Sequence, residues 1–225
     1  LLERGRKRRE EIIEYWETKA YKKKLQKLKD SGALCTGMQE EDGSWNYDPF
    51  QTDKIDDYYF DFEDADRYVG FIQECVPMYA SSFGTEEGDF MTLLDWQKRP
   101  VLNIFGWKLK KTGYRRYKDI FTYVPRKNGK SSYIGAIVLA FMKLEQEGGM
   151  QIISAANTVD QAKEVFKFVK NAVLMDGYLK DYFKTYRSAV TAKEDMDSYK
   201  PISADAGVQD GLNVNLAVMD EVHEF

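Results

Sequence analysis

Short apolar runs alternate with amphipathic stretches through the second half of the chain, and this order limits the folds open to it. The runs at 119–124, 151–155 and 214–219 are short and apolar, as is typical of strands. Between the first two runs, and again after the second, apolar residues recur at helical spacing, so a helix is expected in each place. The second helix is expected to begin at Thr158, because Thr158 and Gln161 have the spacing of a capping box. Strand–helix–strand–helix–strand order favours helical crossovers. The sequence therefore predicts an α/β fold with a mainly parallel central sheet flanked by helices.

The first part of the chain predicts two helices and a long loop. A basic helix is expected over 10–29, stopped by Asp30-Ser31-Gly32, and it either docks by a narrow stripe or contacts a partner. The stripe comprises Ile12, Ile13, Trp16, Ala20, Leu25 and Leu28. Residues 33–57 show no sustained period and predict a loop, and 64–76 predict a helix that Pro77 ends. We therefore expect a helical and acidic segment over 1–57 and the main domain over 58–225.

Composition excludes several classes of protein. The chain has 225 residues, of which 43% are apolar, so it can bury a core and is not wholly disordered. No apolar run approaches the roughly 20 residues that span a bilayer. Cys35 and Cys75 are too few for a disulfide framework, which favours a reducing cytosol. The single histidine, His223, argues against zinc-hydrolase and His-triad chemistry; it is either a polar residue after a strand or a relay of nucleotide state.

Charge is small overall but uneven. The net charge is −4, yet residues 1–29 carry eleven Lys or Arg and five Glu, a net +6. Residues 40–66 carry eleven Asp or Glu and one Lys, a net −10. This asymmetry either steers a polyanion to one face or reflects two solvated polar segments.

A phosphate-binding loop is predicted between the run at 119–124 and the helix that follows. Gly129 allows the backbone to approach an anion, Lys130 can reach the β- and γ-phosphates, and Ser131 can ligate Mg²⁺. The helix N-terminus adds backbone N–H groups. Val124 stands where the first glycine of the common pattern is expected. The alternative is a basic turn that only joins two elements.

Two acids follow the last apolar run. Asp220 and Glu221 lie where a buried strand ends, so their carboxylates can project into a crevice. In an ATPase the first acid holds the Mg²⁺ shell and the second polarises the attacking water. An apolar run that ends in Asp-Glu is common, but the two motifs in this order predict an ATP site with Mg²⁺. Upstream, Gln97 can pair with the N6 amine and N7 of adenine, although a surface Gln is the usual alternative.

These residues resemble the ATPase domain of the large terminase subunits of tailed bacteriophages. The resemblance runs from about residue 58 to the end, and the Arg-Lys-Asn-Gly-Lys-Ser loop is its most specific part. Its other stretches are 61–65, 96–97, 105–107, 114–117, 157–162, 210–213 and 219–223. The resemblance implies a RecA-like P-loop ATPase of the ASCE type, here with an N-terminal helical extension. It also implies a C-terminal nuclease domain beyond Phe225, so we expect the sequence to be a fragment of a longer protein, with a split or truncated gene product as the alternative.

The resemblance also implies site residues and partners. The nucleotide-binding residues are Gln97, Arg126, Lys127, Asn128, Gly129, Lys130, Ser131 and Ser132; the catalytic ones are Glu221, Arg126 and Lys130; Ser131 and Asp220 hold the metal. Arg126 stands early in the loop, where its guanidinium either acts as an arginine finger or pairs with a nearby acid and shapes the loop. The implied partners are double-stranded DNA, the portal protein, the small terminase subunit and further copies of the chain in a pentameric ring on the prohead. The implied location is the host cytoplasm, with no membrane.

Two other functions fit parts of the sequence. Asp220-Glu221-Val222-His223 also spells the Asp-Glu-x-His signature of superfamily 2 helicases, but that class needs a second RecA-like domain, which 225 residues do not hold. The chain can instead be a nucleotide-binding structural module without turnover. The expected function is the ATPase motor that moves double-stranded DNA into a prohead.

Overall fold

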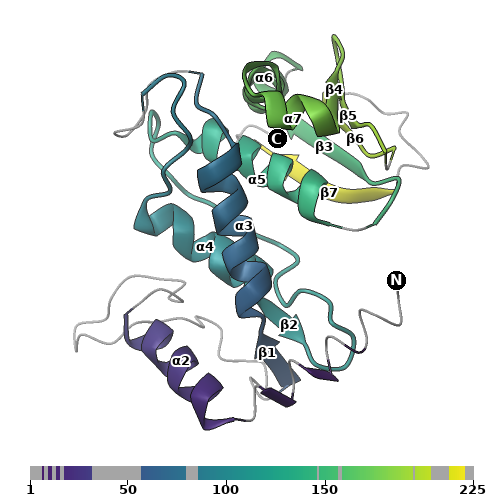
Figure 1. Cartoon of the computed structure of the whole chain (residues 1–225). Coiled ribbons are helices and arrows are strands. Elements are labelled where there is room, and N and C mark those ends of the chain that lie inside the picture. The colour runs from purple at the N-terminus through teal and green to yellow at the C-terminus, as the bar shows by residue number, and fades with distance from the viewer. Residues whose placement is uncertain are drawn as a thin grey trace. The chain divides into compact units, whose positions relative to one another are not determined.

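The computed structural model describes residues 18–31, 57–79, 86–145, 147–156, 159–194, 196–203 and 213–220, with positions 7, 10, 11, 14 and 15. The chain divides into two compact units (Figure 1). The first unit comprises Leu1–Gly70 and Leu93–Thr122, and the second comprises Phe71–Thr92 and Tyr123–Phe225. This division does not coincide with the expected boundary at residue 57. No helix among the described residues has the length and apolar character needed to cross a membrane.

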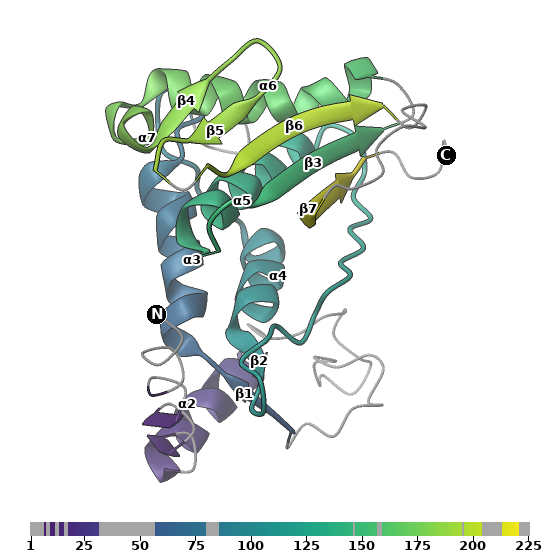
Figure 2. The same cartoon turned by 90° about the vertical axis from the view of Figure 1, so that its right-hand side faces the viewer.

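The second unit is built on a five-stranded sheet with the order β4-β5-β6-β3-β7. The strands are β3 (Gln151–Ala156), β4 (Phe183–Thr185), β5 (Val190–Ala192), β6 (Ser198–Ser203) and β7 (Val214–Met219). β3 pairs in parallel with both β6 and β7, and Figure 2 shows these three arrows pointing the same way. The α/β fold and the strands at 151–155 and 214–219 are confirmed. The sheet is mixed, because β4, β5 and β6 are joined by short turns that permit antiparallel pairing alone.

Three helices pack within the second unit: α5 (Lys130–Leu144), α6 (Val159–Met175) and α7 (Gly177–Tyr182). The apolar residues of α6 that recur at helical spacing are buried; they are Ala162, Val165, Phe166, Val169 and Val173. α5 lies against α6 at Gly135, where an added Cβ would stand 2.5 Å from the ring of Phe168. The close approach of the two helices therefore depends on a glycine. α6 ends at Met175, and Asp176 caps α7 by accepting a hydrogen bond from the Leu179 N–H.

The strand expected over 119–124 is wrong. These residues form no helix or strand in the structure. Phe121 and Tyr123 are 81% and 90% exposed, and no described strand pairs with them. A run of apolar and aromatic residues has strand propensity, but a strand forms only where a neighbour satisfies its backbone groups and covers one face.

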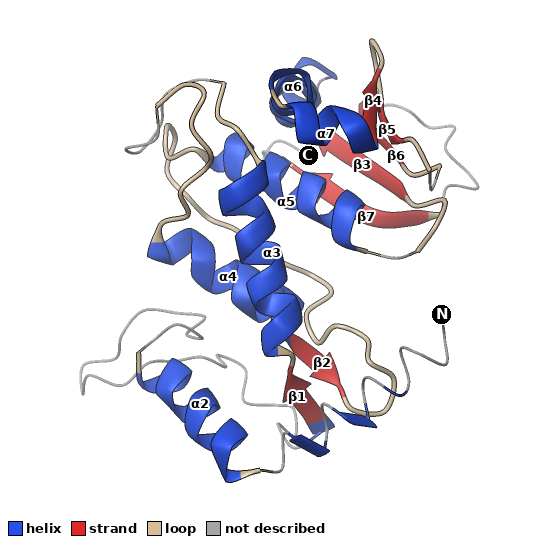
Figure 3. Ribbon diagram, in the orientation of Figure 1, coloured by secondary structure: helices blue, strands red, loops and turns tan. Residues whose placement is uncertain are grey.

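The first unit combines a two-stranded sheet with helices; Figure 3 draws strands in red and helices in blue. β1 (Tyr58–Phe60) pairs antiparallel with β2 (Trp107–Leu109), and α4 (Asp95–Gly106) leads directly into β2. α3 (Phe62–Cys75) confirms the helix expected over 64–76; it ends before Pro77 and contributes its residues up to Gly70 to this unit. Apolar residues recur at helical spacing along α3 and just beyond it, and they are buried: Ala65, Tyr68, Val69, Ile72 and Val76.

The basic N-terminal helix differs from the prediction of one helix over 10–29. α2 spans Lys19–Asp30, because Thr18 has extended backbone angles and its hydroxyl accepts a hydrogen bond from the Tyr21 N–H as a helix cap. The expected stop at Asp30-Ser31 is confirmed. Ala20 is exposed, whereas Tyr21 is fully buried. Ile12, Ile13 and Trp16 lie outside the described residues.

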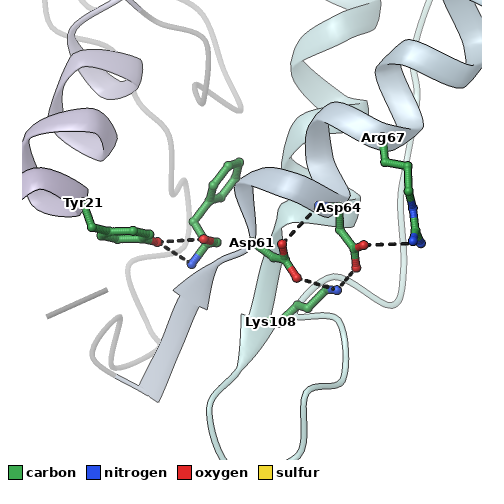
Figure 4. Close-up of polar contacts among 6 residues, drawn as sticks. Tyr21, Asp61, Asp64, Arg67 and Lys108 are labelled. Atoms are coloured by element: carbon green, nitrogen blue, oxygen red, sulfur yellow. Dashed lines mark hydrogen bonds and ion pairs between the residues drawn. The ribbon is translucent and has the colours of Figure 1, made fainter. Parts of the chain in front are cut away.

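Tyr21 anchors α2 through its hydroxyl rather than through an aliphatic stripe. The hydroxyl donates to the Phe60 carbonyl and accepts from the Phe60 N–H, both at 2.8 Å, as Figure 4 shows. The Tyr21 and Phe62 rings meet edge to face at 5.1 Å. Docking of the helix on its own unit, one of the two expected roles, therefore occurs through Tyr21.

A buried ion cluster joins β2 to the start of α3 (Figure 4). The Lys108 ammonium contacts the carboxylates of Asp61 and Asp64, and Arg67 lies 3.3 Å from Asp64. The Asp61 N–H donates to the Gly106 carbonyl at 2.7 Å. Two motif stretches of the sequence, 61–65 and 105–107, therefore meet here, and their role in this structure is to hold the first unit together.

Candidate nucleotide-binding site

The predicted phosphate loop forms a tight turn before α5. Lys127 and Gly129 both have left-handed backbone angles, with φ of 67° and 68°. Such angles cost a lysine conformational energy and are found mostly where function demands a special turn. The Asn128 side-chain amide donates to the Pro125 carbonyl at 3.1 Å and fixes the turn. Gly129 is the N-cap of α5 and supplies no capping side chain, which suits an anion at the helix N-terminus.

The loop and the acidic motif, far apart in sequence, meet in the second unit. The Lys130 ammonium lies 3.0 Å from the Asp220 carboxylate, and these side chains are 25% and 9% exposed. Asp220 follows β7 directly, and its N–H donates to the Ala155 carbonyl of β3 at 3.0 Å. The parallel pairing of β3 with β7 therefore carries the carboxylate to the N-terminus of α5.

The donors near this pair are oxygen atoms. Ser131 and Ser132 occupy the first turn of α5 and are half-buried, and Asp220 is buried. A hydroxyl and a carboxylate are ligands that Mg²⁺ prefers, so the residues present fit that ion. Among the described residues no group of three or more His, Cys, Asp or Glu side chains could hold a metal by itself.

The other predicted site residues fall into three groups. Arg126 and Lys127 are exposed on the loop. Gln97 belongs to the first unit, where it is 5% exposed and its Oε1 accepts a hydrogen bond from the Leu94 N–H at 2.9 Å, capping α4. Glu221 and His223 lie outside the described residues, as does Cys35. Sequence reasoning missed the direct Lys130–Asp220 contact and the capping role of Gln97, although three-residue spacing to the helix start signals such a cap.

Comparison with known proteins agrees with this geometry. The family described as "Terminase large subunit, ATPase domain" matches residues 95–225, which include Gln97, the loop and both acids. No curated protein matches the chain.

Among solved structures, the chain is similar to that described as "Crystal structure of the HK97 bacteriophage large terminase", with a TM-score of 0.58 and 24% identity. The match covers 69% of this chain and 30% of the HK97 chain, so this chain spans about a third of the length of that relative. The shared fold and the family match over more than half of the residues lead to one assignment: the chain belongs to the family of terminase large-subunit ATPase domains.

Proposed function

We propose that the chain binds Mg²⁺-ATP at the phosphate loop and hydrolyses it, as the ATPase part of a motor that moves double-stranded DNA into a phage prohead. The observation that carries the proposal is the 3.0 Å contact between Lys130 and Asp220. In a P-loop ATPase the loop lysine binds the phosphates and the aspartate at the end of the strand holds the Mg²⁺ that neutralises them. The two side chains must therefore lie close together. A basic turn that only connected two elements has no need of a buried carboxylate partner.

Each residue has a separate task in this proposal. Lys130 exchanges its carboxylate partner for β- and γ-phosphate oxygens, and the N–H groups at the start of α5 take the remaining charge. Ser131 and Asp220 hold Mg²⁺, which supplies neutralisation of the phosphate charge when it is bound. Glu221 orients and polarises the attacking water. Arg126, Lys127, Asn128, Gly129 and Ser132 line the phosphates, and Gln97 reads the adenine.

The partners follow from the family. A terminase motor acts on double-stranded DNA with a portal protein and a small terminase subunit, in a ring that we propose to be a pentamer, in the host cytoplasm. The printed description of the HK97 relative says only that it is a large terminase. These partners are therefore proposals for this chain.

The test is nucleotide binding and turnover by three single variants. Lys130→Ala should abolish hydrolysis, because the positive charge on the β/γ-phosphates is lost. Asp220→Ala should weaken Mg²⁺-dependent nucleotide binding, whereas Glu221→Gln should bind nucleotide normally and not hydrolyse it. Lys167→Ala is the matched control, because Lys167 is an exposed lysine that forms an ion pair with Glu164 of its own helix, α6. Wild-type turnover by Lys130→Ala would exclude the site.

The same measurements separate the alternatives. A nucleotide-binding structural module would bind ATP in a Lys130-dependent manner and show no turnover, either in this chain or in a longer form. Assays in both lengths therefore distinguish a module from a motor domain that needs further residues.

A further inference from the structure

A short hairpin in the first unit carries strong positive charge. Residues 107–118, which we call the basic hairpin, contain six Lys or Arg and no Asp or Glu, in a chain whose net charge is −4. The segment comprises β2, a turn and the chain that returns beside it. The nearest acids in sequence, Asp95 before it and Asp119 after it, lie outside the segment, as does Asp57, whose backbone carbonyl accepts a hydrogen bond from the Lys110 N–H.

Backbone hydrogen bonds hold this hairpin in one conformation. The Leu109 N–H donates to the Tyr114 carbonyl at 2.8 Å, and the Gly113 N–H donates to the Leu109 carbonyl at 2.7 Å. Gly113 has a φ of 77°, which a glycine adopts without strain. The Arg116 N–H donates to the Trp107 carbonyl at 2.9 Å and closes the base. The cations are therefore presented on a fixed backbone.

The basic side chains divide into one internal and several surface groups. Lys108 is internal, because it contacts the buried carboxylates of Asp61 and Asp64. Lys111 and Lys118 are exposed and form no ion pair with any described residue. Tyr114, between them, is 69% exposed.

Aromatic rings orient the two arginines of the hairpin. The Arg116 guanidinium lies 4.9 Å from the Tyr58 ring centre and 5.2 Å from that of Tyr117. The Arg115 guanidinium lies 5.9 Å from the Phe105 ring centre. Stacking fixes the plane of a guanidinium, so less side-chain entropy is lost when it binds an anion.

We infer that the basic hairpin contacts the phosphate backbone of double-stranded DNA. Lysine and arginine side chains and tyrosine hydroxyls are among the groups that contact phosphates in protein–DNA complexes, and such contacts carry no direct information on base sequence. A packaging motor has to bind every sequence it moves, so this chemistry suits the substrate. The inference rests on the proposed function and assigns its DNA contact to Lys111 and Lys118, with Tyr114 between them.

The experiment measures the affinity of the chain for a short labelled duplex by fluorescence anisotropy, without nucleotide, over a range of salt concentrations. In the double variant Lys111→Ala/Lys118→Ala two phosphate contacts are lost. The slope of log K against log salt should become shallower by about 1.8, which is about a 60-fold loss of affinity at 0.1 M salt. The loss should be equal for duplexes of unrelated sequence.

The matched control is Lys180→Ala/Lys193→Ala, which removes two exposed lysines from the second unit. It should bind DNA like the wild type, and circular dichroism should show both double variants folded. Wild-type affinity of the hairpin variant, equal loss in the control, or no DNA binding by the chain overturns the inference. Unchanged DNA affinity with weaker binding to polyglutamate assigns the hairpin to an acidic protein surface instead.

Failure here is distinguishable from failure of the proposed ATPase. ATP turnover without DNA reports on Lys130, Asp220 and Glu221, none of which is changed in the hairpin variant. If turnover depends on Lys130 but DNA binding ignores the hairpin, only the DNA contact is wrong. If DNA binding needs the hairpin but ATP is neither bound nor hydrolysed, only the ATPase is wrong.

Discussion

Lys130 has a carboxylate partner before any nucleotide arrives. The 3.0 Å contact with Asp220 means that the ammonium is neither unpaired nor fully in water. An unpaired buried charge is costly, so the pair stabilises the loop in its binding conformation. In the proposed function, nucleotide binding would replace one anion beside Lys130 with another, and Asp220 would become available to the metal in the same step.

Arg126 is exposed on the loop, which leaves its guanidinium accessible to a phosphate of its own or a neighbouring subunit. If it acts as a finger, Arg126→Ala should lower the hydrolysis rate by about 10³-fold with little change in nucleotide affinity, because the contact strengthens in the transition state. Single-turnover kinetics and equilibrium binding check this. Recovery of rate on mixing with excess Glu221→Gln subunits would place the finger in the neighbour. An equal fall in rate and affinity would make Arg126 a ground-state binder.

Gln97 has a structural role that affects its test as an adenine reader. Gln97→Ala should lower ATP affinity more than GTP affinity, because adenine alone offers the N6-donor and N7-acceptor pair. The same change removes the acceptor for the Leu94 N–H and should reduce the free energy of unfolding by about 1 kcal/mol. Gln97→Glu keeps that acceptor but lacks the amide donor. If Gln97→Glu unfolds with the wild-type free energy but no longer binds ATP in preference to GTP, Gln97 recognises the base. If the affinities for ATP and GTP fall equally, it does not.

The chemistry of the site was more predictable than its contacts. Residue types and chain order were enough to propose Lys130, Ser131 and Asp220, because phosphate and Mg²⁺ restrict their ligands to few side chains. The left-handed angle of Lys127 and the cap made by Gln97 could not be predicted, because both depend on how the backbone turns locally. Tyr21 was missed for a related reason: its partner is the backbone of Phe60, which no side-chain pattern reveals.

At the scale of elements, periodic helices were predicted well and isolated strands poorly. α3 and α6 bury the faces that their apolar spacing indicates, since a helix satisfies its backbone internally. The run at 119–124 has strand composition but no partner among the described strands. β4, β5 and β6 were missed, because their sequences, FKT, VTA and SYKPIS, contain no continuous apolar run like those that marked β3 and β7.

The contact between α5 and α6 provides a test of packing. Gly135→Ala should reduce the free energy of unfolding by about 1–3 kcal/mol, because the new Cβ would stand 2.5 Å from the buried Phe168 ring. Urea unfolding monitored by circular dichroism measures the change. Gly70→Ala is the matched control: nothing lies within 4 Å of its added Cβ, and alanine in a helix should stabilise by about 0.5–1 kcal/mol. Equal stability of Gly135→Ala and wild type would show that the helices separate readily.

For the whole molecule, buried phenols make stability fall at alkaline pH. Burial raises the pKa of Tyr21, Tyr133 and Tyr199 above the ordinary value of 10.0. Above pH 10 the unfolded chain therefore loses protons that the folded chain retains, so the free energy of unfolding falls as pH rises. The expected slope is about 1.4 kcal/mol per pH unit for each phenol, about 4 for the three together.

Urea unfolding across pH 9 to about 11 checks this slope. Tyr133→Phe is the sharpest variant, because burial is the one cause of the raised pKa of Tyr133. It should remove about a third of the alkaline slope. The same slope in the variant as in the wild type would mean that other groups cause the alkaline loss.

The strand order of the second unit also affects how the protein becomes active. β4, β5 and β6 are neighbours in the chain, whereas β3 pairs with β7 across a separation that runs from Gln151 to Val214. Pairing over long separations closes a large loop and is slow, so we expect β7 to join last. In refolding, binding of a fluorescent ATP analogue should appear only in the slowest phase, and binding in an earlier phase would contradict this order. Because Asp220 directly follows β7, we expect that completion of the sheet and assembly of the proposed nucleotide site are one kinetic event, so that a chain that is still folding would not consume ATP.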